Sequence, residues 1–325
     1  MSFSCHISGF GHAVPERILT NQELSEMIDT SDEWIIERTG IKQRHIANDE
    51  DSSATLGAQA ATRALEKAGV NALDLDLIIT ATCTPSGMFP STASRIQHSI
   101  GASCGAFDIN AACNGFVTAL STASQLIHAR SAEKILVIGS EVLSRITDWS
   151  DRGTCVLFGD GAGAVILERN RENEIGQIFP PALGSDGGAA ELLFASGPCT
   201  APSDLLDQDA KIIMDGRSVF KYAVTAMAEA VENALKKANL KADDIDICIP
   251  HHANKRIIKA LMERLGLPIE RAFVNVQKYG NTSSASIPIA LSEALEEKRL
   301  KSGDTVLFVA FGGGLNWGAM IANWG

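Results

Sequence analysis

The hydrophobic and polar positions of this chain follow two periods that alternate along its length. Several segments place an apolar residue every three to four positions, which predicts amphipathic helices. They are residues 54–69, the stretch from about Cys113 to His128, and residues 222–240, 254–266 and 290–300. Short apolar runs predict buried strands at residues 75–83, 134–140, 245–250 and 304–314. This alternation predicts an α/β protein from end to end.

The chain also repeats itself. Residues 64–79 align without gaps on residues 234–249, with eight identities in sixteen positions. Two further pairs follow in the same order, residues 119–138 with 290–309 and residues 163–167 with 318–322. Two copies are too few for a solenoid, whose units need several neighbours to bury their faces. The repeats therefore predict two similar halves packed about a pseudo-twofold axis.

The join between the halves is expected near residues 170–185, where the chain turns polar and rich in proline and glycine. An N-terminal half then spans residues 1–172, and a C-terminal half spans residues 173–325.

Of the 325 residues 45% are hydrophobic and 21% charged, which is ample material for a large core.

Composition narrows the class of protein. No run approaches the ~18 uncharged apolar residues that a membrane helix needs, and the N-terminus lacks the pattern of a signal peptide, so a soluble, cytoplasmic protein is expected. The seven cysteines include no C-x-x-C pair, which favours reduced thiols over disulfides or zinc. A net charge of −11 argues against a nucleic-acid surface, although a local basic patch could serve an acidic partner.

The stretch "FDINAACNGFVTAL" places Cys113 between a strand-like run and a helix-like run. At a helix start, unpaired backbone N–H groups and the positive end of the helix dipole favour a thiolate. The small neighbours Ala111, Ala112 and Gly115 would admit a substrate and permit a strained turn. The pattern predicts a nucleophile, and the alternative is a buried structural cysteine.

The repeat makes Ser284, within "YGNTSSAS", the counterpart of Cys113. Both helix starts should therefore face the central axis. Asn281 and Thr282 are ordinary N-cap residues, and capping alone is the competing explanation for them. Capping does not explain why the counterpart of Cys113 stands in so dense a polar run.

His251 follows the predicted strand that ends at Pro250, with His252 and Asn254 close behind. Side chains at the carboxyl ends of such strands line the usual ligand crevice of an α/β protein. The histidines could instead face solvent or serve the structure. A metal site is less expected, because no matching cluster of ligands stands nearby in the sequence.

Two glycine-rich segments remain. In "VAFGGGLNWG", Gly312 to Gly314 could aim N–H groups at a developing oxyanion, although alone this is a weak signal. The segment "FGDGAGAV" lacks the Lys-Ser/Thr of a phosphate-binding loop and leads into a strand, so a tight structural turn is favoured.

Together these motifs resemble a known family, the β-ketoacyl-acyl carrier protein synthase III group of thiolase-fold condensing enzymes. The resemblance covers essentially the whole chain. It rests on "TSDEWIIERTGI", "AACNGF", "SDRGTCVLFGDGAGAV", "PHHANKRI", "YGNTSSAS" and "AFGGGLNWG". It implies a thiolase-like fold with a layered αβαβα core, in which the N-terminal half bears the nucleophile and the C-terminal half bears a histidine and an asparagine.

The resemblance implies a catalytic triad of Cys113, His251 and Asn281. It also implies an oxyanion hole formed by the backbone N–H groups of Cys113 and Gly313. His252 stands where the family usually has glutamine, which adds a second titratable ring, and Asn114 stands where alanine is frequent.

The implied reaction has two halves. Cys113 takes an acyl group from an acyl-coenzyme A. Malonyl-acyl carrier protein then loses CO2, and the resulting carbanion attacks the acyl-Cys113 carbonyl while His251 and Asn281 hold the enolate oxygen. No metal or organic cofactor is expected, because the thioester and the departing CO2 drive the chemistry. The asparagine donates without titrating.

Further roles are also implied by resemblance. Trp34 and Arg152 would stack on the adenine of coenzyme A. Arg38 and Asn254 would lie near its pantetheine arm and phosphates. Phe220 would help to exclude water from the enolate. Phe89 would reach across a homodimer interface. Spacing adds a further expectation: Arg256 and Lys259 are three apart on one predicted helix face and, with Lys221, could attract an acidic carrier protein, with a solvated helix face as the alternative. Met88, Phe89 and Met214 are candidates for the wall that sets the starter chain length.

Fatty-acid initiation by an acetyl-coenzyme A-like starter is the leading prediction. One alternative is a secondary-metabolite enzyme of the same fold, of polyketide or quinolone type, that joins or transfers acyl groups on another acceptor. The other is a catalytically silent partner subunit. The presence of Cys113, His251 and Asn281 together argues against the silent subunit.

Overall fold

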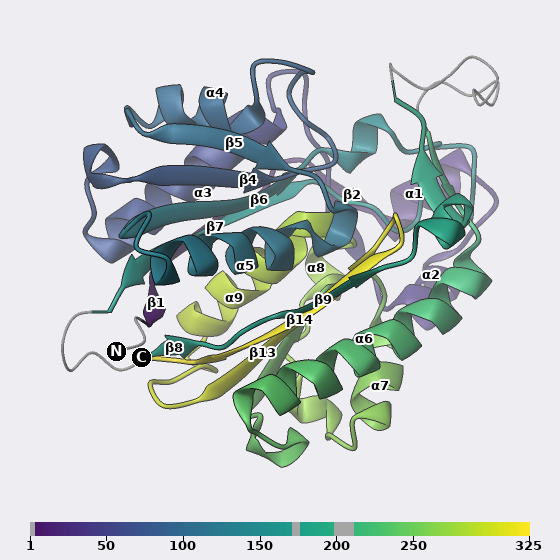
Figure 1. The fold of residues 1–325 in the computed structure, drawn as a ribbon. Helices are drawn as coiled ribbons and strands as arrows, with labels where there is room; N and C mark the ends of the chain where they lie inside the picture. The colour runs from purple at the N-terminus through teal and green to yellow at the C-terminus, as the bar shows by residue number, and fades with distance from the viewer. Residues whose placement is uncertain (1–3, 171–175, 198–210) are drawn as a thin grey trace.

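The computed structural model describes residues 4–170, 176–197 and 211–325, and it contains two mixed sheets (Figure 1). In the first the strand order is β1-β7-β6-β4-β5, and in the second it is β12-β13-β14-β8, with β9 also paired to β14. The first sheet consists of β1 (Cys5–Ala13), β4 (Leu77–Ala81), β5 (Gly105–Ile109), β6 (Lys134–Glu141) and β7 (Gly161–Arg169). The second consists of β8 (Gln177–Ile178), β9 (Ala182–Ser185), β12 (Ile247–Pro250), β13 (Thr305–Gly312) and β14 (Asn316–Asn323).

Helices cover both faces of each sheet, so that the molecule has five layers (Figure 1). The outer layer on the first sheet is α3 (Ser53–Ala68) with α4 (Thr92–Ser99), and that on the second is α6 (Gly216–Ala238) with α7 (Lys255–Arg264). Two helices, α5 (Gly115–His128) and α9 (Ser286–Glu296), lie between the sheets and contribute to a buried core that both sheets share. The αβαβα layering expected from the resemblance is confirmed.

The repeated sequence segments fall on equivalent elements. The first pair ends in β4 and β12, the second runs from α5 into β6 and from α9 into β13, and the third lies in β7 and β14. In the first half β6, the strand after the central helix, pairs in parallel with β4 and antiparallel with β7. In the second half β13 pairs in the same way with β12 and β14. A parallel bridge between Cys248 and Ala272 stands where β5 pairs with β4. The fold is therefore two duplicated α/β halves; the exact join, predicted at 172/173, lies outside the described residues.

Smaller elements form a cap at one end of the layers. They are α1 (Asn21–Met27), α2 (Asp32–Thr39), α8 (Val276–Tyr279), β2 (Ile18–Thr20), β3 (Gln43–His45), β10 (Leu193–Ala195) and β11 (Ile212–Met214). A hydrophobic cluster joins α1 and α2 to the segment 143–158 and to Val276. Gly161 begins β7, so "FGDGAGAV" is the turn into a strand that the sequence favoured.

Capping residues explain where the long outer helices begin and end. Ser52 and Thr55 form a capping box at the start of α3, and Gly69 closes that helix with a φ of 64°. Asp215 accepts hydrogen bonds from two backbone N–H groups, so α6 begins at Gly216, earlier than the periodicity alone indicated. No helix in the described ranges is long and apolar enough to cross a membrane.

Candidate active site

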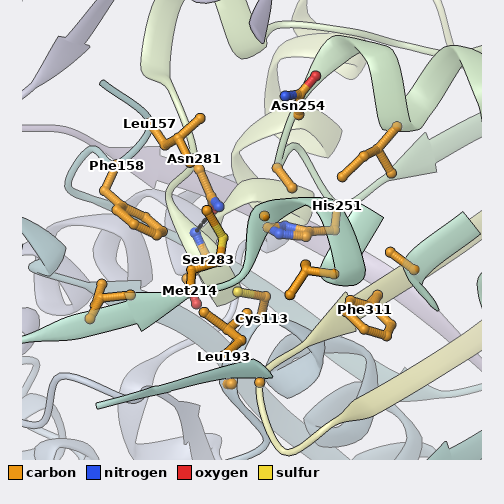
Figure 2. Close-up of a pocket in the computed structure, with 18 of the residues that line it drawn as sticks. Cys113, Leu157, Phe158, Leu193, Met214, His251, Asn254, Asn281, Ser283 and Phe311 are labelled. Carbon is orange, nitrogen blue, oxygen red and sulfur yellow. Dashed lines mark hydrogen bonds between the residues drawn. The ribbon is translucent and has the colours of Figure 1, made fainter. Parts of the chain in front are cut away.

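A cavity of about 920 Å³ opens between the two halves beneath the cap. It brings together residues distant in sequence, and Figure 2 shows Cys113, His251 and Asn281 converging on it from three different segments. Gly313 lines the same space. The structure therefore places the residues implied as catalytic, and the glycine implied for the oxyanion hole, around one cavity.

Cys113 lies in a 3₁₀ turn, Ala112–Asn114, immediately before α5. Ala112 has a φ of 45°, so the strained turn expected at the nucleophile is present. The backbone N–H of Ala112 donates to Asn110 Oδ1 at 3.1 Å, which holds that turn. The expected thiolate is not the resting form, because burial raises the pKa of the Cys113 thiol to about 12.

Gly312 explains how the second half approaches the nucleophile so closely. A Cβ atom at this position would lie 2.5 Å from the Cys113 nitrogen and 3.0 Å from its Cβ. No side chain fits in that gap without moving the turn. A glycine is therefore required for packing here, while the neighbouring Gly313 faces the cavity.

His251 follows β12 and is fixed on two sides. Its backbone N–H donates to the Val309 carbonyl at 2.8 Å, and its Nδ1 lies 2.7 Å from Ser286 Oγ. Burial, followed by the neighbouring His252, lowers the pKa of His251 to about 3, against a smaller opposing effect from the Ser283 backbone. The ring is therefore neutral at physiological pH and presents a defined edge to the cavity.

Asn281 is only 6% exposed and is held by backbone bonds to the segment across from it. Its N–H donates to the Leu157 carbonyl at 2.8 Å, and its carbonyl accepts from Gly159 N–H at 3.0 Å. The side-chain Oδ1 accepts the Ser283 N–H at 2.9 Å. Because the amide oxygen is used in this way, the Nδ2 donors remain for the cavity, so the residue caps the turn and also serves the site.

His252, the departure from the family pattern, is directed away from the cavity. Its Nε2 lies 3.1 Å from the Phe273 carbonyl and 3.2 Å from the Asn275 nitrogen. Burial lowers its pKa to about 4, so it is also neutral. Asn114, the second departure, is buried and donates from Nδ2 to Thr118 Oγ1 at 3.2 Å. Neither residue lines the cavity.

The residues expected at the coenzyme lie around the cavity mouth. The Arg152 guanidinium stacks over the Trp34 ring at 4.1 Å, and that of Arg38 lies 5.5 Å from the same ring. Asn254 caps α7 and donates from Nδ2 to the Arg38 carbonyl at 3.1 Å. Trp34, Arg38 and Asn254 line the cavity, whereas Arg152 reaches it only through Trp34.

The residues proposed for the carrier protein divide into two groups. Lys221 and Arg256 line the cavity mouth, where the Arg256 guanidinium lies 5.9 Å from the Phe220 ring. Phe220 lines it as well. Lys259 lies outside and forms an exposed ion pair with Glu263 at 3.7 Å. The structure thus groups Lys221, Arg256 and Phe220 but leaves Lys259 on the helix surface.

The residues suggested for the acyl wall are not all at the cavity. Met214 lines it, but Met88 and Phe89 do not. Met88 is 65% and Phe89 85% exposed. The prediction that these two residues line the cavity is wrong for this single chain, because both side chains are exposed in the loop after β4.

Sequence reasoning missed several residues at the site. Cys83 and Ser283 line the cavity, and Glu141 lies behind them. The tight turn residue Asn110 was also missed, although the repeat aligns it with Asn281 and so offered a signal. No group of three or more His, Cys, Asp or Glu side chains in the described part of the chain is placed to hold a metal ion.

Comparison with known proteins gives consistent matches. Two family models match, "3-Oxoacyl-[acyl-carrier-protein (ACP)] synthase III" at residues 107–187 and its C-terminal counterpart at residues 235–324. The chain is 49% identical to the beta-ketoacyl-[acyl-carrier-protein] synthase III of Natranaerobius thermophilus, over 97% of both chains.

Solved structures match over the whole chain as well. The 3-oxoacyl-[acyl-carrier-protein] synthase III of Aquifex aeolicus VF5 superposes with a TM-score of 0.93 at 47% identity, over 98% of this chain and 100% of that one. The priming beta-ketosynthase of the R1128 polyketide biosynthetic pathway superposes with a TM-score of 0.93 at 33% identity, over 99% of this chain and 97% of that one. The similarity therefore extends through the whole chain and both halves.

Proposed function

Since this chain belongs to the β-ketoacyl-[acyl-carrier-protein] synthase III family, we propose that it is the condensing enzyme that initiates fatty-acid biosynthesis. It joins a short acyl-coenzyme A starter to malonyl-acyl carrier protein. The observation that supports this most directly is the convergence of Cys113, His251 and Asn281 on one cavity. The polyketide-type alternative comes second, because that relative is the less similar in sequence.

In the first half-reaction the Cys113 sulfur attacks the thioester carbonyl carbon of the acyl-coenzyme A. The carbon–sulfur bond to the coenzyme breaks, and the thiol proton of Cys113 ends on the departing coenzyme thiol. The backbone N–H groups of Cys113 and Gly313 stabilise the tetrahedral oxyanion, which typically lowers the barrier by about 3 kcal/mol per donor. The neutral ring of His251 suits this step, because it adds no charge to the cavity.

In the second half-reaction malonyl-acyl carrier protein loses CO2 and leaves an enolate. The Nε2–H tautomer of His251, with Nδ1 accepting from the Ser286 hydroxyl, donates to the enolate oxygen beside Asn281 Nδ2. The carbanion attacks the acyl-Cys113 carbonyl, and the cysteine leaves to give 3-oxoacyl-carrier protein. Phe220 helps to exclude water from the enolate. The reaction needs no metal or organic cofactor.

Coenzyme A binding at the cavity mouth requires one rearrangement. An adenine sandwiched between Trp34 and Arg152 needs two stacking distances of about 3.5 Å, whereas the two groups are 4.1 Å apart here. Arg152 therefore swings outward when the base enters. Arg38 and Asn254 then flank the phosphates and pantetheine arm.

The carrier protein is expected on the surface next to the mouth. Arg256 and Lys221 lie at the cavity, and Lys259 continues the basic surface along α7. This local basic patch attracts an acidic partner despite the overall charge of −11. Because Lys259 is already paired to Glu263, it contributes least.

The enzyme is proposed to act as a cytoplasmic homodimer. The edge strand β5 carries Phe107, which is 39% exposed. Phe89 is exposed in the loop before α4, whose first residue, Thr92, donates its N–H to Asp108 of β5. An exposed strand edge with large apolar side chains is normally covered by a partner. Phe89 of one protomer would then reach the partner's acyl site.

Intact-mass analysis tests the first half-reaction. The protein is incubated with a panel of acyl-coenzyme A thioesters of increasing chain length, and an adduct equal to the acyl group is expected on Cys113. Cys113→Ala should remain unmodified, while Cys83→Ser, which removes the other thiol lining the cavity, should still be acylated. No adduct with any thioester, or an adduct that persists in Cys113→Ala, would exclude this function.

A malonyl-carrier protein assay on the acylated enzyme tests the second half-reaction. Release of CO2 together with 3-oxoacyl-carrier protein is expected. An enzyme that acylates but does not release CO2 with this acceptor belongs to the secondary-metabolite alternative.

A further inference from the structure

The loop at residues 313–315, between β13 and β14, carries the Gly313 N–H group that the proposed mechanism uses as an oxyanion donor. Gly313 lies just beyond the end of β13 and lines the cavity. Its N–H donates to no other backbone group in the described part of the chain. The group is therefore available to a substrate, and its catalytic value depends on how firmly it is aimed.

Both ends of this loop are fixed by the backbone. Gly312 pairs with Asn316 at the end of the β13–β14 ladder. The Asp186 N–H donates to the Leu315 carbonyl at 2.8 Å, and the Leu315 N–H donates to the Asp186 carbonyl at 2.9 Å. The two glycines between these ends have no Cβ atom, so sterics allow their backbone many orientations. Strand pairing alone therefore does not fix the direction of the donor.

The Asn316 side chain supplies the missing restraint. Its Nδ2 lies 2.7 Å from the Gly313 carbonyl oxygen. A carbonyl oxygen can only accept, so the amide nitrogen and not the amide oxygen must face it. A Cβ atom at Gly314 would overlap this same Nδ2, which shows that the amide lies directly over the loop backbone. Asn316 also lines the cavity, so this hydrogen bond is made at the site itself.

The hydrogen bond acts on the peptide that carries the donor. The Gly313 N–H belongs to the peptide between Gly312, which the ladder fixes, and the Gly313 α-carbon, whose carbonyl Asn316 fixes. A Cβ atom at Gly313 would lie 2.8 Å from the Leu193 carbonyl oxygen, so β10 limits movement from another direction. With both sides of this peptide held, its N–H has one orientation.

We propose that Asn316 is a positioning residue for the oxyanion hole. By holding the Gly313 carbonyl it aims the Gly313 N–H at the oxygen that becomes negative when a nucleophile adds to the acyl carbonyl. A tetrahedral oxyanion forms in both half-reactions, so both depend on this side chain. The inference rests on the proposed function in taking Gly313 as an oxyanion donor.

Two reactions of the same sulfur test this role. Acylation of Cys113 by acetyl-coenzyme A passes through a tetrahedral oxyanion. Alkylation by iodoacetamide displaces iodide from a saturated carbon and forms no such oxyanion. Peptide mass spectrometry separates modification of Cys113 from that of Cys83, the other thiol that lines the cavity. Comparing the two rates therefore separates the oxyanion hole from the reactivity and accessibility of the sulfur.

Asn316→Leu keeps the size and branching of the side chain but removes the donor, and Asn316→Ala removes both. At saturating acetyl-coenzyme A, or the thioester that labels the wild-type protein fastest, acylation should be about tenfold slower in both variants. Alkylation should stay within about twofold of wild type. The half-saturating concentration should also stay within about twofold, because the coenzyme is proposed to bind at Trp34 and Arg38. A side chain that only fills space would let leucine restore acylation.

Asn323→Leu is the matched control, since this asparagine lies at the opposite end of β14 and accepts from Thr305 Oγ1 at 3.3 Å. Both of its rates should equal those of wild type. Wild-type acylation in Asn316→Leu, or equal slowing of acylation and alkylation, would overturn the proposal. Loss of the folded circular-dichroism spectrum in both Asn316 variants would also overturn it, because the side chain would then support the fold. Absence of any acyl adduct on the wild-type protein refutes the proposed function instead.

Discussion

The two central helices, α5 and α9, begin with the same backbone turn, but different residues surround the two turns. Before α5, Asn110 Oδ1 accepts the N–H of Ala112, whose φ is 45°. Before α9, Asn281 Oδ1 accepts the N–H of Ser283, whose φ is 49°. The duplicated halves have therefore kept a costly backbone conformation at both places. The two turns differ in the groups that face them.

Each helix start packs against strand ends of the opposite half. Cys113 meets Gly312, the last residue of β13, while Ser284 meets Glu141, the last residue of the equivalent strand β6. Gly312 lets the backbone approach the Cys113 turn so closely that no side chain fits between them, whereas Glu141 at the equivalent position reaches its turn through hydrogen bonds. The first turn therefore brings Cys113 to the cavity, and the second is joined through Ser284 to a buried carboxyl group.

Removing the asparagine from each turn should give the largest difference. Asn281→Ala should leave acylation of Cys113 by acyl-coenzyme A nearly unchanged but slow the condensation by about 10²-fold or more, because one enolate donor is lost. Intact mass measures the first step, and release of CO2 with product formation measures the second.

The counterpart, Asn110→Ala, removes only the bond to the Ala112 N–H and is the matched control. A loss of about 1 kcal/mol of stability and a condensation rate within about threefold of wild type are expected. Equal losses of condensation in the two variants would show that Asn281 acts on the turn rather than on the enolate.

A methyl group beside the nucleophile should have the next largest effect. Gly312→Ala would place a Cβ atom 2.5 Å from the Cys113 nitrogen, so the turn must shift. We expect a loss of about 2 kcal/mol in the free energy of unfolding and about tenfold slower acylation, because the sulfur and the oxyanion donors move together. Denaturant melts and adduct formation over time measure the two effects.

Gly163→Ala serves as the comparison for that variant. Its Cβ atom would lie 2.7 Å from the Ile289 nitrogen, on α9 and away from the cavity. It should cost a similar free energy of unfolding and leave acylation by the folded protein unchanged. If both variants acylate at the wild-type rate, close packing at Gly312 has no catalytic role.

The repeat in the sequence was the strongest predictor of the fold. Residues 64–79 and 234–249 align because each leads through a helix and a short turn into a buried strand, so their buried positions are under the same constraints. The placement of Cys113 and Asn281 at paired turns followed from the second repeat, residues 119–138 with 290–309. The start of α6 could not be predicted from the sequence pattern, because Asp215 caps a first turn whose apolar pattern is weak.

The groups behind the cavity could not be predicted, since they depend on tertiary contacts alone. Glu141 bonds Ser284 across 143 positions of sequence, and a glutamate at the end of an apolar strand gives no local signal. The prediction of a resting thiolate at Cys113 was wrong for a related reason. Sequence shows the helix start that favours the charge but not the burial that opposes it.

His252, which stands at the family's glutamine position, should give the smallest effect at neutral pH. Because the ring is neutral and does not line the cavity, His252→Gln should keep condensation within about twofold of wild type.

The same substitution should have a larger effect on the stability of the protein at acidic pH. Burial holds the pKa of His252 at about 4, below the ordinary value of about 6.5 in the unfolded chain. Between these values the unfolded state binds more protons, so stability is lost as pH falls through this window. His252→Gln should therefore lose about 2–3 kcal/mol less than wild type between pH 7 and 4, measured by urea melts. Parallel losses in both proteins would mean that His252 is already charged in the folded state.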